Sequence, residues 1–400
     1  MQKIINGFWF LPKKALRFIL SVFIILETGG CFNESKTPDF EHTVNLKKIS
    51  FAELPDWNKD NFKDVITVFS KNCNSILNNK KEYIYSSRIK IKTEDYKDIC
   101  SRFGNKNIKT SEQMKKFLES EFIPYSVSDG DNDEGKFTSY YEAEINASFE
   151  KTEKYKYPIY GKPSDLIEVN LRDFGTDLPN TRLVGRVKDG KFIPYYNRKE
   201  IENNGIKAPV IMWGDDLVDI HFMQIQGSAI AHMSDGSDLR VGYADNNGHK
   251  FRGIGGILLS KKLIEPKDAS MTKIREWLRK NPKKASELMA ENERFIFQKI
   301  SDADGPVGAL GVSLTPGRSL AVDNTYIPLG AVMWLDTYNP DKQNIRKIVF
   351  AQDIGSAIKG VVRGDYFWGH GEQALKEAGR MNSVGRYFIL APKKNGLKVE

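Results

Sequence analysis

Short apolar segments, separated by glycine, proline, asparagine and aspartate, dominate the sequence from about residue 136 to 265 and again over the last hundred residues. Short segments bounded by turn residues are typical of β-strands. The clearest are residues 137–147, 219–226, 238–243, 332–335, 347–352 and 387–390. The sequence shows no internal repeat at a solenoid period. The pattern therefore predicts closed β-barrels rather than a βαβ array.

Helical periodicity lies mostly outside these segments. Apolar side chains recur at helical spacing from Phe62 to Leu77. Thr110 and Gln113 form the capping-box pattern of a second helix, which we expect to run to about residue 122. Further helices are expected at about 270–290, where Ser270 can cap the first and Asn281 with Pro282 can open the next, and near 372–379. We therefore expect a mainly β fold with peripheral helices.

The N-terminus has the features of a lipoprotein export signal. Basic residues precede an apolar run at 18–26, and small residues ending in Gly30 then lead to Cys31. This order is typical of an exported chain, and the small residues before the cysteine resemble a lipoprotein processing site. We predict a signal peptide over 1–30, acylation of Cys31 and a polar tether over 31–50. A simple cleaved signal or an uncleaved anchor is the alternative.

Composition and motifs exclude several classes of protein. The apolar fraction is 40%, the charged fraction is 28% and the formal net charge is +8, without a block of Lys and Arg interleaved with aromatics. Nucleic acid is therefore not an expected partner. The five histidines show no metal-ligand spacing, and there is no C-x-x-C, Walker, dinucleotide or Gly-x-Ser-x-Gly pattern. We expect no metal and no cofactor. Cys73 and Cys100 form either a disulfide, which an oxidising periplasm permits, or two buried thiols.

Three aspartates in the C-terminal third, Asp323, Asp353 and Asp365, each lie beside a glycine or a turn. Asp353 ends an apolar strand, so its carboxyl would project from a rigid element. Burial at the edge of an apolar barrel raises the pKa of a carboxyl and keeps a proton available near neutral pH. Gly355 would let a large ligand approach the backbone closely. Taken alone, these positions are also those of ordinary turn residues.

The aspartates belong to a longer series of motifs. The series comprises F-T-S-Y-Y-E at 137–142, Y-P-I-Y at 157–160, F-M-Q-I-Q-G-S at 222–228, Y-A-D-N-N-G-H at 243–249, Asp323 with I-P-L-G at 327–330, D-I-G-S-A-I-K-G at 353–360, and G-D at 364–365. Over roughly residues 120–392 this order resembles the membrane-bound lytic murein transglycosylase A family. The chain departs from the family pattern at Ser139, Ala143, Phe251 and Ser356. Ser139 and Ser356 adjoin the expected cleft, so the departures concern the details of its subsites.

The resemblance implies a double-psi β-barrel and a second, smaller β-barrel, with glycan bound in a groove between them. We expect an N-terminal helical part and the start of the large domain over 51–144, the smaller barrel over 145–240 and the catalytic barrel over 241–400. The implied partners are the glycan strands of peptidoglycan, a membrane reached through the lipid anchor, and complexes for cell-wall synthesis or division. The implied location is the periplasmic side of the outer membrane.

The family cleaves the β-1,4 bond between N-acetylmuramic acid and N-acetylglucosamine and leaves a 1,6-anhydromuramoyl end. Ordinary glycosidases need two carboxylates. Attack by the sugar's own 6-hydroxyl removes that need, because one carboxyl can first donate and then accept the proton. The resemblance assigns both steps to Asp353 and makes Asp365 an auxiliary group whose charge would raise the pKa of Asp353. The expected substrate-binding residues are Asp323, Tyr140, Tyr141, Gln226, Ser228, Gly355 and Lys359.

Two other functions are compatible with this barrel. An expansin-like protein would bind glycan without cutting it, and Asp353→Asn would then leave its function intact. A polysaccharide hydrolase would use Asp365 or Asp323 as a second carboxylate and would release a free reducing end.

Overall fold

The computed structural model of the protein describes residues 42–84, 88–179 and 181–399. The predicted signal peptide, Cys31 and the tether up to residue 41 lie outside these residues. In the part of the chain that is described, none of the helices combines the length and the apolar character needed to cross a membrane.

Six strands close into a ring, which we call the larger barrel. In order around the ring they are β17 (Asn382–Pro392), β14 (Val332–Tyr338), β15 (Asn344–Ile354), β13 (Ser319–Val322), β16 (Arg363–His370) and β4 (Gly135–Ser148), and β4 pairs again with β17. The β13–β15 and β16–β4 pairs are parallel. Large side chains such as Trp334, Phe350 and Tyr387 are fully buried in its core. A small pair, β2 (Ile89–Lys90) with β18 (Lys398–Val399), lies outside the ring.

Two further strands extend the ring at β17. They are β1 (Val44–Lys48) and β3 (Phe122–Asp129), which pair with each other in antiparallel register. The predicted tether is therefore too long at its C-terminal end. Val44 and Leu46 alternate with polar residues and pack against the core, which draws this segment into the sheet.

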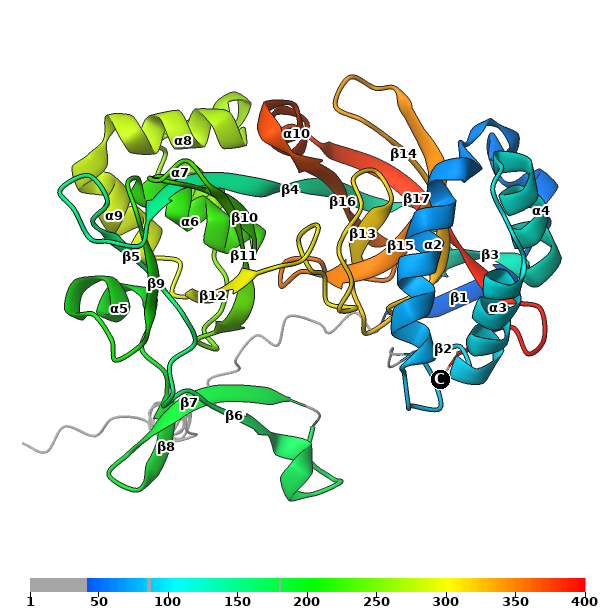
Figure 1. The fold of residues 1–400 in the computed structure, drawn as a ribbon, viewed down its shortest axis with the longest axis horizontal. Coiled ribbons are helices and arrows are strands. Elements are labelled where there is room, and N and C mark those ends of the chain that lie inside the picture. The colour runs from blue at the N-terminus through cyan, green and yellow to red at the C-terminus, as the bar shows by residue number, and fades with distance from the viewer. Residues whose placement is uncertain (1–41, 85–87, 180, 400) are drawn as a thin grey trace, which may run out of the picture. The chain divides into compact units, whose positions relative to one another are not determined.

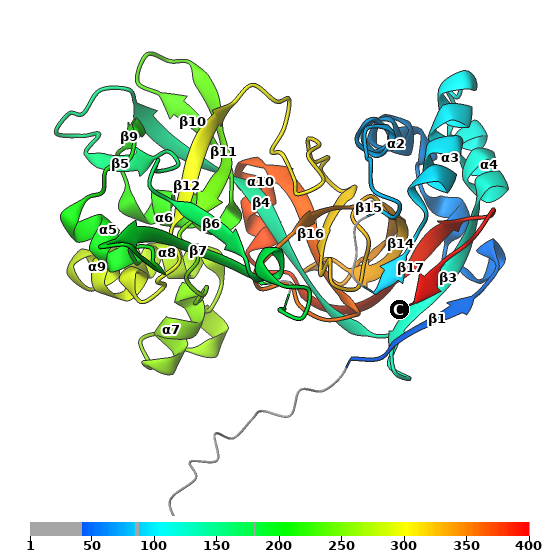
Figure 2. The same cartoon turned by 90° about the horizontal axis from the view of Figure 1, so that it is seen from below.

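Helices α2 (Phe62–Leu77), α3 (Thr93–Asn105) and α4 (Ser111–Glu121) lie together on the side of the larger barrel farthest from β5 and β9 (Figures 1 and 2). The predicted helix over 62–77 and the capping box of Thr110 and Gln113 are confirmed. A disulfide between Cys73 and Cys100 joins α2 to α3.

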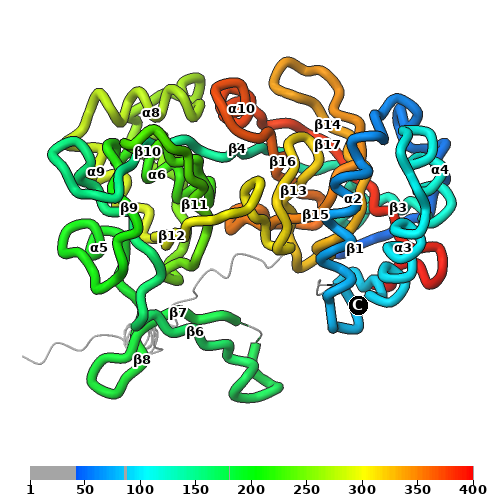
Figure 3. The backbone as a smooth tube through the Cα atoms, in the orientation of Figure 1, coloured from blue at the N-terminus to red at the C-terminus, as the bar shows by residue number. Residues whose placement is uncertain are grey.

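The C-terminal half of β4 enters a second sheet. There β4 pairs in parallel with β10 (Ala229–Met233), and β11 (Asp238–Asn246) and β12 (Ile296–Ser301) follow in the sheet. On the other side of β4 lie β9 (Val210–Gly214) and then β5 (Tyr157–Tyr160). Figure 1 shows β4 running from one sheet to the other, and Figure 3 shows the chain crossing back through the segment after β12. The mainly β fold is confirmed. The predicted boundary at residue 240 falls inside β11, and the division into domains stays a prediction.

Helices cover the second sheet, and a small sheet extends from it. The helices are α5 (Arg198–Asn204), α6 (Leu217–Gln226), α7 (Ile254–Ser260), α8 (Met271–Lys280) and α9 (Pro282–Ala290), and α10 (Gly371–Ala378) lies beside β4 and β16. The small sheet consists of β6 (Ile167–Asn170), β7 (Arg182–Lys188) and β8 (Lys191–Pro194), at the bottom of Figure 1.

The strand predicted at 219–226 is wrong, because α6 occupies these residues. Asp216 caps the helix by accepting a hydrogen bond from the Val218 amide at 2.7 Å, and Gly227 ends it with a φ of 87°. The helix is buried on nearly all sides, so its apolar residues do not mark one face and their short run resembles a strand.

A buried ion pair joins the segment before α2 to the larger barrel. Arg318, directly before β13, contacts the Asp60 carboxylate with both Nη atoms at 2.7 and 2.8 Å. The same carboxylate accepts a hydrogen bond from the Ile348 amide of β15 at 2.8 Å. Both side chains are at most 5% exposed. Loss of either partner would therefore leave a charge buried and unpaired.

We expect Asp60→Ala to lower the free energy of unfolding by about 3–5 kcal/mol, because it leaves the Arg318 guanidinium buried without its carboxylate. Asp64→Ala is the matched control. Asp64 lies 3.8 Å from the same guanidinium but is 59% exposed, so we expect a change of roughly 0.5 kcal/mol or less. Urea denaturation measures both variants. Equal losses for the two would contradict this account.

Candidate active site

Strand register brings two carboxyls to either side of one small residue. On β13, Ala321 pairs with Asp353 of β15 in one direction and with Asp365 of β16 in the other. On the next strand, Thr138 of β4 lies opposite Asp365. Alternate residues of a strand share a face, so Tyr140 lies on the same face as Thr138. Four polar side chains from three strands thus meet above the Ala321 methyl group.

Asp353 is held by donors on both carboxyl oxygens. The Ala309 amide donates to Oδ1 and the Tyr140 hydroxyl donates to Oδ2, each at 3.0 Å. The pKa of Asp353 is raised to about 6, chiefly by burial and to a smaller extent by the nearby charge of Asp365, while the hydrogen bonds oppose the rise. Burial and Asp353 together also raise the pKa of Tyr140, which therefore stays a hydrogen-bond donor.

Asp365 has a different environment. The Thr138 hydroxyl donates to its Oδ1, and the Arg363 Nη2 donates to the Thr138 oxygen at 2.7 Å. Because the Thr138 oxygen accepts from Arg363, its own proton is directed at Asp365. Burial raises the pKa of Asp365, whereas Thr138 and the positive charge of Arg363 favour its ionised form. Asp365 therefore has a neighbouring cation that favours its ionised form, whereas Asp353 has none among the groups that shift its pKa.

A cleft of about 610 Å³ opens over these groups, between the larger barrel and the second sheet. Asp353, Asp365 and five of the seven expected substrate-binding residues line it: Tyr140, Gln226, Ser228, Gly355 and Lys359. Gln226 is the last residue of α6, and its Oε1 accepts a hydrogen bond from the Tyr141 amide at 3.2 Å. The helix that sequence analysis missed therefore supplies part of the wall facing the carboxyls.

The structure does not bring Tyr141 or Asp323 to this cleft. Tyr141 follows Tyr140 on β4 and so faces the other side, where its buried hydroxyl contacts the Arg275 Nη1 at 2.9 Å. Asp323 is 3% exposed and accepts hydrogen bonds from the amides of Thr325 and Gly360, at 3.1 and 3.0 Å. Its carboxylate holds the loop over 354–360, which carries Gly355 to the cleft.

Sequence analysis missed Thr138, Ala309 and Arg363 as partners of the two carboxyls. Arg363 and Thr138 stand beside motif residues, but their contact spans 225 positions of sequence. The Ala309 contact is made through a backbone amide, which any residue would supply. Within the described ranges, no group of three His, Cys, Asp or Glu side chains is arranged to hold a metal ion.

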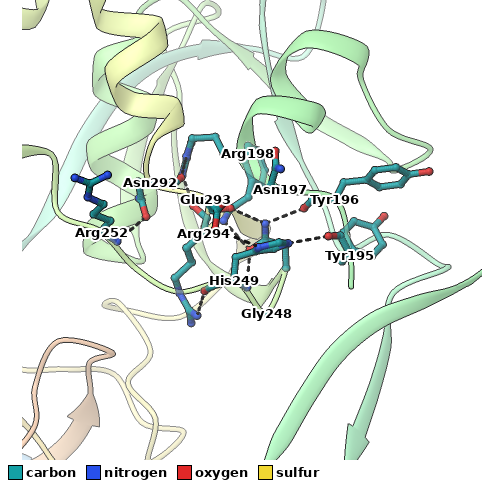
Figure 4. Close-up of polar contacts among 12 residues, drawn as sticks. Tyr195, Tyr196, Asn197, Arg198, Gly248, His249, Arg252, Asn292, Glu293 and Arg294 are labelled. Atoms are coloured by element: carbon teal, nitrogen blue, oxygen red, sulfur yellow. Dashed lines mark hydrogen bonds and ion pairs between the residues drawn. The ribbon is translucent and has the colours of Figure 1, made fainter. Parts of the chain in front are cut away.

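Polar contacts fix the segment 292–294, which leads into β12 at the opposite wall (Figure 4). The buried Arg198 donates from Nε to the Asn292 carbonyl oxygen at 2.9 Å and from Nη2 to the Arg294 carbonyl oxygen at 2.7 Å. The Arg294 guanidinium donates to the His249 carbonyl oxygen at 3.2 Å. Asn292 and Arg294 also line the cleft, so this network places part of its wall.

Comparisons with known proteins agree with this arrangement. Residues 136–299 match the family model described as the MltA specific insert domain, and residues 318–391 match the 3D domain. The chain is 27% identical over 348 residues to a membrane-bound lytic murein transglycosylase A homolog of Buchnera aphidicola, covering 82% of this chain and 87% of that protein. It is 30% identical to membrane-bound lytic murein transglycosylase A of Escherichia coli over 264 residues, which are 64% of this chain and 65% of that protein.

A solved structure extends the comparison. A crystal structure of MltA from Neisseria gonorrhoeae is 31% identical, covers 89% of this chain and 95% of its own, and superposes with a TM-score of 0.77. The likeness therefore includes both the larger barrel and the second sheet.

We expect Asp353→Asn to stabilise the fold at neutral pH. The folded-state pKa of Asp353 is raised from 3.8 to about 6. Ionisation of Asp353 therefore lowers the free energy of unfolding. This cost is absent below pH 4, grows as pH rises to 6 and is complete above pH 6. Asparagine does not ionise. After allowance for partial solvent screening, the gain is about 1–2 kcal/mol at pH 7.5 and near zero at pH 4.

Denaturant unfolding at the two pH values measures this difference, with the exposed Asp64→Asn as control. Destabilisation by Asp353→Asn at pH 7.5, or an equal effect at both pH values, would contradict the raised pKa of Asp353.

Proposed function

The chain belongs to the membrane-bound lytic murein transglycosylase A family, and from this premise we propose that it cleaves the glycan strands of peptidoglycan by a lytic transglycosylase reaction. The observation that carries the proposal is the half-buried Asp353 carboxyl at the cleft, with a pKa raised to about 6. Such a group holds a proton close to neutral pH and is suited to general acid catalysis.

Asp353 performs both proton transfers in this proposal. Its proton passes to the glycosidic oxygen as the bond from that oxygen to the anomeric carbon of N-acetylmuramic acid breaks. The 6-hydroxyl of the same sugar attacks the anomeric carbon, and its proton passes to the Asp353 carboxylate. The products are a free 4-hydroxyl on N-acetylglucosamine and a 1,6-anhydromuramoyl end, and the acid is restored without a water molecule. The Ala309 amide and the Tyr140 hydroxyl stabilise the carboxylate between the two steps.

Asp365 remains ionised during the reaction. Thr138 and Arg363 fix its orientation, and its negative charge favours the positive charge that develops on the sugar ring in a transition state of oxocarbenium type. The same negative charge opposes ionisation of Asp353. Asp365 thus supports the acid without itself exchanging a proton with the substrate.

The groove residues bind the strand on both sides of this centre. Tyr140 supplies an aromatic face, Gln226 and Ser228 supply hydrogen-bonding groups from the second sheet, and Gly355 leaves room for a sugar ring against the backbone. We propose the larger barrel and the second sheet as the two domains that hold the strand.

A lipid on Cys31 would anchor the enzyme to the periplasmic side of the outer membrane, where cell-wall synthesis or division complexes are candidate partners. The export pattern of the N-terminus supports this location, as does the description of the curated relatives as membrane-bound.

Mass spectrometry of peptidoglycan digested by the full-length protein tests the proposal. We expect muropeptides with 1,6-anhydromuramoyl ends, each lighter by one water than the product of hydrolysis. Asp353→Asn should lower their rate of formation by about 10³-fold, because the general acid is lost. Products with a free reducing end would instead identify a hydrolase. Glycan binding without any product, unchanged in the variant, would identify an expansin-like protein.

A further inference from the structure

Charge is divided unequally between the two walls of the cleft. The larger barrel contributes the acidic residues that line the cleft, Asp353 and Asp365, together with two cations, Lys359 and Arg363. The residues of the opposite wall include no acidic side chain. The opposite wall, formed by β11, β12 and the segment before β12, contributes three cations: Arg240, Lys299 and Arg294. A neutral polysaccharide would require no such wall, whereas a ligand with negative charge would be attracted to it.

Two of the cations flank an open position on the sheet. In the β11–β12 ladder, Gly242 lies opposite Lys299, and Arg240 lies opposite Ser301. Arg240 and Gly242 are two residues apart and share a face, which makes Arg240 and Lys299 diagonal neighbours at about 7–8 Å between their Cα atoms. A Cβ added at Gly242 would meet no atom within 4 Å. A small group can therefore lie over Gly242 between the two cationic side chains.

The protein compensates the charge of Arg240 with a carboxylate but leaves the charge of Lys299 without one. Lys299 is exposed, and in the described part of the chain its ammonium group has neither an ion pair nor a hydrogen bond. Arg240 is held from behind, because its Nε contacts the buried Glu142 carboxylate at 3.0 Å. That contact fixes the guanidinium while its two terminal nitrogens keep no partner among residues 42–84, 88–179 and 181–399. Arg294, farther along the wall, donates to a carbonyl oxygen rather than to a carboxylate (Figure 4).

We propose that Arg240 and Lys299 form a subsite over Gly242 for a carboxylate carried by the glycan strand. The inference rests on the proposed function and specifies its substrate further. An oriented guanidinium and a mobile ammonium match a carboxylate, which accepts hydrogen bonds on both oxygens. Peptidoglycan offers this group in two places, the lactyl ether of muramic acid where the stem peptide has been removed, and the stem peptide itself. A strand without carboxylates gains nothing from the subsite.

Binding measurements separate this inference from the proposed catalysis. The protein is full-length and carries Asp353→Asn, so that strands are not consumed, and it is compared with the same protein carrying Lys299→Met in addition. The probes are soluble glycan strands in three forms: stripped of peptide with free lactyl carboxylates, bearing intact stem peptides, and stripped with every carboxylate converted to a methylamide. Isothermal titration gives Kd for each pair. Lys299→Arg, which keeps the charge, is the matched control.

We expect Lys299→Met to weaken binding of a carboxylate-bearing strand roughly tenfold at low salt, the effect of losing one charge-assisted hydrogen bond. Binding of the methylamide strand should not change, and Lys299→Arg should bind like the parent. The loss should shrink in about 0.5 M salt, where charges are screened over a few ångströms. A loss with stripped strands identifies the lactyl carboxylate, and a loss confined to peptide-bearing strands identifies the stem peptide.

Equal Kd values for the parent and Lys299→Met with both carboxylate-bearing strands would overturn the inference, as would an equal loss with the methylamide strand. Failure of the proposed function has a different signature, namely the absence of anhydro products from the protein with Asp353 intact, and it leaves these affinities measurable.

Discussion

A carboxyl group buried beside an apolar barrel ionises less readily than one in water, and around Asp353 this cost of desolvation is only partly offset. The Ala309 amide and the Tyr140 hydroxyl hold the side chain in one orientation and moderate the rise in pKa. The charge of Asp365 acts in the opposite sense. Thr138 and Arg363 in turn favour the ionised form of Asp365. Two partly buried aspartates, on the strands that flank β13, thereby acquire different electrostatic environments.

One strand makes this arrangement possible. The first half of β4 belongs to the larger barrel and places Thr138 and Tyr140 against the carboxyls, while its second half pairs with β10 in the second sheet. The acid centre and the wall that faces it therefore share a continuous backbone. The cations of β11 and β12 lie on that facing wall, which carries no carboxyl at the cleft, whereas on the barrel side Lys359 and Arg363 accompany the two carboxyls. The net positive charge of the cleft is therefore concentrated on the facing wall. A strand of sugars bearing carboxylates matches this polarity.

Features set by local sequence could be predicted. The amphipathic pattern and the capping box located α2 and α4, and the apolar run before Asp353 located the end of β15 and Asp353 with it. Strand alternation could also have separated Tyr140 from Tyr141, but their shared motif suggested one role for both. The α6 helix was missed because burial on nearly all sides erases its periodicity. The partners of the carboxyls come from segments 44 to 227 positions away, and only the closed barrel brings them together.

The central claim, that Asp353 carries the proton at the site, is tested most directly by titration of its carboxyl. Protein labelled with ¹³C at the aspartate carboxyl carbon, compared with Asp353→Asn to assign the resonance, would give the pKa by NMR. The account predicts a pKa for Asp353 of about 6 and a lower value in Asp365→Asn, because a neighbouring negative charge has been removed. An ordinary aspartate pKa near 4, unchanged by that substitution, would contradict it.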